Sequence, residues 1–76
     1  MAGALILVVA EVDSMRDLFE EIKSLTMVRE ARMLAGFYDI MVIAESDKLS
    51  EIMDTLIEKI RSIDGVGETA THIFIE

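Results

Sequence analysis

The continuously apolar stretch ALILVVA, residues 4–10, is the feature that most constrains the fold of this chain. It is far shorter than the roughly 20 residues that a membrane-spanning helix requires. Because it is short and rich in Leu and β-branched side chains, it predicts a strand buried on both faces. Residues 40–44, IMVIA, predict a second strand of this kind. Two such strands belong in the centre of a sheet.

Two other segments carry apolar residues at helical spacing. The first stripe, over residues 15–25, consists of Met15, Leu18, Phe19, Ile22 and Leu25. Ser14, followed by Asp17 three residues later, is its predicted N-cap. The second stripe consists of Leu49, Ile52, Met53, Leu56, Ile57, Ile60 and Ile63, with Ser46 or Asp47 as the predicted cap and Gly65 as the predicted end.

Two further segments have the mixed composition of edge strands. Residues 28–35 alternate loosely and carry three charges, and residues 68–76 alternate polar and β-branched side chains. The resulting order is strand, helix, strand, strand, helix, strand. It predicts one α+β domain over residues 1–76, a ferredoxin-like βαββαβ sandwich whose four-stranded antiparallel sheet carries two helices on one face.

Apolar content of 53% and a mean hydropathy of +0.45 are high for 76 residues, because a small protein has much surface to cover with polar groups. Both helices lie on one face of the predicted sheet, yet the central strands are apolar on both faces. The second face is therefore expected to pack against another copy of the chain in a homodimer. That contact would be formed by one of two alternating sets of residues on the first strand: Leu5, Leu7 and Val9, or Ile6 and Val8.

Charge and composition restrict the function further. Fifteen acidic and seven basic residues give a net charge of −8, which disfavours binding to nucleic acid and to anionic membranes. The chain has no cysteine, and its lone His72 has no second His beside it in sequence, so neither a metal nor another cofactor is expected. No signal peptide is recognisable at the start of the sequence, which predicts a cytoplasmic protein.

Three landmarks resemble a known family. They are the Gly-x-Tyr-Asp turn at 36–39, the Ile-x-Gly-Val at 63–66 after the second helix, and Thr69 and Thr71 at the start of the last strand. Together they are similar to the effector-binding (RAM) domain of the Lrp/AsnC family, which has the dimeric α+β barrel architecture. No helix-turn-helix precedes residue 4, so the resemblance is to a stand-alone form of this domain.

The resemblance implies a function in transcription regulation. In relatives the domain dimerises through its sheets, the dimers associate into rings, often octamers, and small ligands, usually amino acids, bind between dimers near the Gly-x-Tyr-Asp turn. Co-assembly with full-length Lrp/AsnC regulators is a further implied partnership. The residues expected to bind the ligand are Gly36, Phe37, Tyr38, Asp39, Thr69 and Thr71.

The chemistry of these residues suits a zwitterion. Gly36 would let backbone N–H groups approach a carboxylate, Asp39 would pair with an ammonium group, and Tyr38 would form a wall. Simpler interpretations remain: Gly36 as a turn residue with positive φ, and Asp39 as an acceptor for a local N–H. Phe37 departs from the family, because relatives often carry a polar or acidic residue there, and it favours an apolar ligand or a protein contact.

Two other functions are compatible with this fold. A small enzyme of the dimeric α+β barrel group would need an acid and a base in its cleft, and only His72 and Asp39 are candidates. A purely structural oligomer would need no ligand. An RNA-recognition module is disfavoured, because the two central strands carry neither aromatic rings nor a basic face.

Overall fold

The computed structural model describes residues 1–11, 13 and 15–75, and it confirms the predicted element order. The strands are β1 (Ala2–Ala10), β2 (Val28–Met33), β3 (Ile40–Ser46) and β4 (Val66–Ile73). The first helix is α1 (Met15–Lys23), and the second consists of a π-helical part, η2 (Glu51–Leu56), followed by α2 (Ile57–Arg61). Ser14, the predicted cap of the first helix, lies outside the described residues.

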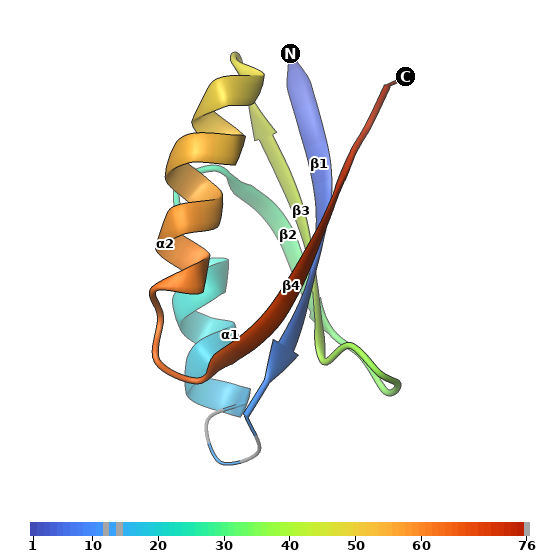
Figure 1. The fold of residues 1–76 in the computed structure, drawn as a ribbon, viewed down its shortest axis with the longest axis vertical. Helices are drawn as coiled ribbons and strands as arrows, with labels where there is room; N and C mark the ends of the chain where they lie inside the picture. The colour runs from blue at the N-terminus through green and yellow to red at the C-terminus, as the bar shows by residue number, and fades with distance from the viewer. Residues whose placement is uncertain (12, 14, 76) are drawn as a thin grey trace.

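The strands form one antiparallel sheet in the order β2-β3-β1-β4. Both helices lie on the same side of this sheet (Figure 1), as a ferredoxin-like fold requires. The two continuously apolar strands, β1 and β3, are the central pair, as predicted. Within the described residues, neither helix is both long enough and apolar enough to span a membrane.

The core lies between the sheet and the helices. Its strand residues are Ala4, Ile6 and Val8 of β1 and Ile40, Val42 and Ala44 of β3, and its helix residues are Leu18, Phe19, Ile22, Ile52, Leu56, Ile57 and Ile60. Burying one Leu or Ile side chain stabilises a fold by about 1.5–3 kcal/mol. This layer is therefore the main source of stability within one chain.

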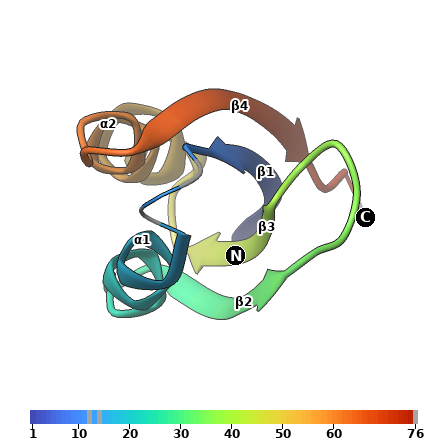
Figure 2. The ribbon, with the colours of Figure 1, turned by 90° about the horizontal axis from the view of Figure 1, so that it is seen from below.

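The opposite side of the sheet, which we call the open face, has no helix over it (Figure 2). Because side chains alternate along a strand, Leu5, Leu7 and Val9 point to this side and are only half-buried. Two rows of cross-strand neighbours cross it: Glu30–Ile43–Leu5–His72 and Arg32–Met41–Leu7–Ala70. Of the two sets predicted from the sequence, Ile6 and Val8 thus face the helices and Leu5, Leu7 and Val9 face outward.

The second helix differs from its prediction in one respect. Leu49 and Met53 were expected in the buried stripe, but 41% and 43% of their surfaces are exposed, whereas Ile52 and Leu56 are fully buried. The π-helical part places more residues in each turn than an α-helix does, so positions spaced for 3.6 residues per turn rotate away from the core. Of the predicted caps, Ser46 contacts the helix, because its hydroxyl donates a hydrogen bond to Glu51.

Candidate functional site

The turn between β2 and β3 projects beyond the sheet on the side away from the helices (Figures 1 and 2). Gly36 lies in this turn with φ of 154°, and no atom outside its chain neighbours lies within 4 Å of the position that a Cβ would occupy. Glycine adopts such a φ without the steric cost that other residues meet. This geometry confirms the interpretation of Gly36 as a turn residue with positive φ.

Asp39 fixes the base of the turn through three hydrogen bonds. Its backbone N–H donates to the carbonyl of Val8 (2.8 Å), and its carbonyl accepts from the N–H of Leu34 (2.8 Å). Its carboxylate oxygen Oδ2 accepts from the N–H of Ala10 (2.7 Å), next to the register shift between Val8 and Ala10. The Asp39 carboxylate therefore gives a backbone N–H at the end of β1 its hydrogen-bond partner. The two residues of this bond, Ala10 and Asp39, are 29 positions apart in the chain.

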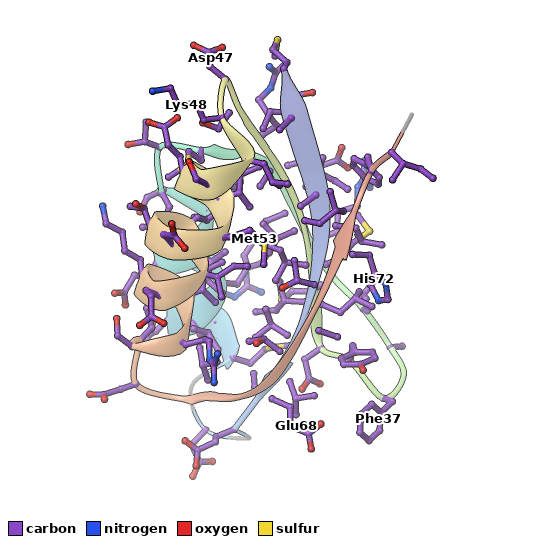
Figure 3. All side chains as sticks on the ribbon, turned by 45° about the horizontal axis from the view of Figure 1, so that its top comes forward. Phe37, Asp47, Lys48, Met53, Glu68 and His72 are labelled. Carbon is purple, nitrogen blue, oxygen red and sulfur yellow. The ribbon has the colours of Figure 1, made fainter. Side chains whose placement is uncertain are left out.

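Two aromatic rings form the tip of the turn. The rings of Phe37 and Tyr38 meet edge to face, with centroids 5.0 Å apart and planes at 88°. Phe37 is 73% exposed and points away from the sheet (Figure 3), whereas Tyr38 is half-buried. The neighbouring Met33 and Leu34 are also exposed, by 40% and 37%. Sequence reasoning missed these two residues, although the uncharged run from 33 to 38 was a signal for them.

Thr69 and Thr71 point to the same face of β4, but not toward the turn. Their cross-strand partners are Val8 and Ile6, so they lie on the helix-covered face. Asp39 and Thr69 also lie on opposite sides of β1, separated by two strand spacings of about 4.8 Å each. One chain therefore brings together the four predicted turn residues and keeps the two threonines apart from them.

The charged residues beside the turn are paired with each other. Arg32, which precedes the turn on β2, is bonded to Glu30, and this hydrogen bond and the Glu30 charge raise the pKa of Arg32 above its usual value. A second pair, Arg29 with Glu45 (2.6 Å), lies at the opposite end of β2, away from the turn. A ligand carboxylate at the turn would therefore meet backbone N–H groups before it met a free guanidinium.

Two surface hollows lie away from the turn. One hollow of about 420 Å³ lies between the ends of the two helices and is lined by Glu21, Leu25, Lys59, Ser62, Ile63 and Asp64. Another of about 420 Å³ lies near the start of the second helix and includes Met27, Arg29 and Glu51. Neither includes a turn residue. The turn is thus a projecting surface, and an enclosed site there requires atoms from another chain.

His72 and Asp39, the acid and base of the alternative enzyme, do not form a pair within one chain. His72 is exposed on the open face beside Leu5, whereas Asp39 is bonded to the backbone at Val8 and Ala10. Their neighbours on β1, Leu5 and Val8, are three residues apart, which corresponds to about 10 Å along the strand. In addition, β1 lies between His72 on β4 and Asp39 at the start of β3.

Comparisons with known proteins agree with this geometry. The family model described as the Lrp/AsnC ligand binding domain matches residues 3–76. An uncharacterized HTH-type transcriptional regulator of Pyrococcus furiosus and one of Pyrococcus horikoshii are each 33% identical over 58 residues. That match covers 76% of this chain and 39% of either regulator, so the chain spans well under half of their length.

Solved structures give the same picture. FFRP-DM1 has a TM-score of 0.92 and 33% identity, with 99% of this chain and 100% of that chain covered. The hypothetical protein PHS023 from Pyrococcus horikoshii has a TM-score of 0.90 and 33% identity, with 100% and 92% covered. E. coli AsnC has a TM-score of 0.87 and 25% identity, with 99% of this chain but 51% of AsnC covered.

Proposed function

Because the chain belongs to the Lrp/AsnC family, as its ligand-binding domain, we propose that it is an oligomeric regulatory module that binds a small molecule and has no chemistry of its own. The proposed effector is an amino acid, and the chain does not bind DNA by itself. Its proposed location is the cytoplasm, and full-length regulators of the same family are proposed partners. The observation that carries this proposal is the family match over residues 3–76 together with the open apolar face.

Self-association is supported by the composition of the open face. The centres of its two rows are apolar, with Ile43 and Leu5 in one row and Met41 and Leu7 in the other. Charged Glu30 and Arg32 lie at one edge. An apolar centre with a polar rim is the usual anatomy of a protein interface. In the proposed homodimer this face packs on the same face of a second chain, and the dimers associate further into rings such as octamers.

The proposed effector site lies where the turn of one chain meets another chain. Backbone N–H groups near Gly36 would receive the effector carboxylate, and the second carboxylate oxygen of Asp39 would receive its ammonium group. The remaining proposed contacts are Phe37, Tyr38, Thr69 and Thr71. Because the two threonines point to the helix-covered face, away from the turn of their own chain, a site that contains both sets takes them from different chains.

The test combines a ligand screen with a measurement of assembly. An amino acid that binds only the folded protein raises its melting temperature, so the twenty amino acids are screened by thermal shift at fixed protein concentration. Calorimetric titration of each hit then gives its affinity, and sedimentation velocity gives the mass. An assembly larger than a monomer that binds at least one amino acid is expected. An oligomer that binds none would favour the purely structural alternative.

A further inference from the structure

We propose that Phe37 is an aromatic anchor that a second copy of this chain covers when chains associate. This inference rests on the self-association proposed above and deepens it, because it assigns the contact to one residue of the β2–β3 turn. It assigns the ring of Phe37 to a protein contact, so that Phe37 would meet the effector only through its backbone, and it leaves the other proposed effector contacts unchanged.

The exposure of Phe37 is the first reason. The ring is 73% exposed, although an aromatic side chain has roughly 150–250 Å² of surface to bury. The ring is also held in place. Tyr38 supports its edge at 5.0 Å, and the three hydrogen bonds of Asp39 fix the base of the turn. An aromatic ring positioned in advance loses little freedom when a partner covers it, as in the residues that dominate binding energy at interfaces.

The charge distribution indicates what kind of partner fits. Residues 33–38, MLAGFY, carry no charge, whereas the whole chain has a net charge of −8. Two copies of such a chain repel each other across most of their surfaces. They can approach where those surfaces are uncharged, and this turn and the centre of the open face are two such places. An anionic partner such as nucleic acid would find no cation at the tip.

Position completes the argument. The turn projects from the same side of the sheet as the open face (Figure 2), so a copy packed on that face lies beside it. Leu34, partly exposed at the base of the tip, continues the apolar surface from the sheet to Phe37. The turn therefore extends the proposed interface beyond the edge of the sheet, with Phe37 at its end (Figure 3).

The sequence provides a direct test, because it contains no tryptophan. In the Phe37→Trp variant the new indole is the only one, and its emission reports whether position 37 is in water or covered. Met53→Trp is the matched control, since Met53 is an apolar residue of the helical layer that is 43% exposed. Both variants are diluted through the monomer–assembly transition, which sedimentation velocity follows in parallel. The emission of the Phe37→Trp variant is expected to shift to shorter wavelength on assembly, and that of Met53→Trp to stay constant.

Truncation provides the second measurement. Phe37→Ala is expected to raise the dissociation constant of the assembly by at least about tenfold, and Met53→Ala by less than about threefold. Two results would overturn this inference alone: the indole of Phe37→Trp stays in water in the assembly, or Phe37→Ala leaves the dissociation constant of the assembly unchanged. A wild-type chain that remains a monomer at every concentration overturns the proposed self-association as well.

Discussion

Asp39 is a residue in which a structural and a binding role can be separated by experiment. Its Oδ2 accepts the N–H of Ala10, so Asp39→Ala leaves a half-buried donor without its partner. We expect the free energy of unfolding to fall by about 1–3 kcal/mol. Asp39→Asn keeps an oxygen acceptor and should lose about 1 kcal/mol or less. Urea denaturation at one fixed protein concentration measures both values.

The same pair of variants tests the effector site. Asn lacks the negative charge that would pair with an ammonium group, so Asp39→Asn should weaken the binding of an amino acid by roughly tenfold to a hundredfold. Calorimetric titration of the folded variant measures this loss. Equal affinities for wild type and Asp39→Asn would restrict Asp39 to its role at the end of β1.

At the scale of an element, the second helix shows how a local change in winding redistributes neighbouring residues. Ile52 is fully buried and Met53 is 43% exposed, although both belong to the apolar stripe of the sequence. Ile52→Ala should therefore lower the free energy of unfolding by about 2–5 kcal/mol, because it leaves a cavity in the core. Met53→Ala is the control and should cost less than about 1 kcal/mol. Similar losses in chemical denaturation would contradict the π-helical winding of residues 51–56.

At the scale of the whole molecule, the proposed self-association depends on the open face. Leu7 lies at the centre of one row, between Met41 and Ala70. A charge there would be buried without a partner in a face-to-face dimer, so Leu7→Glu should shift the protein to monomers. Leu49→Glu, on the exposed side of the helical layer, should keep the mass of the wild type. Sedimentation velocity and circular dichroism together distinguish dissociation from unfolding.

The charge of the molecule supports a second prediction at this scale. With 15 acidic and 7 basic residues, the chain cannot neutralise many phosphates, and non-specific DNA affinity depends on that neutralisation. The pure protein should leave a duplex promoter fragment unshifted in a gel at physiological salt. A sequence-specific complex formed by this chain alone would refute the prediction.

The sequence by itself determined the element order and most of the core. Leu18, Phe19 and Ile22 of α1 follow a helical period, and residues 4–10 and 40–44 are apolar without interruption. These signals are local, because periodicity depends only on neighbouring residues. The turn at Gly36 was equally readable, since glycine is the residue that tolerates a positive φ.

Tertiary structure alone decided which residues face which partner. A strand that is apolar on both faces has two equivalent sets, and only the position of the helices placed Ile6 and Val8 inside and Leu5, Leu7 and Val9 outside. The register between strands distant in the sequence places the Asp39 carboxylate beside the N–H of Ala10. It also places Thr69 opposite Val8, on the helix-covered face of the sheet. Strand register is set by non-local pairing and packing, and for that reason no local pattern in the sequence encodes these contacts.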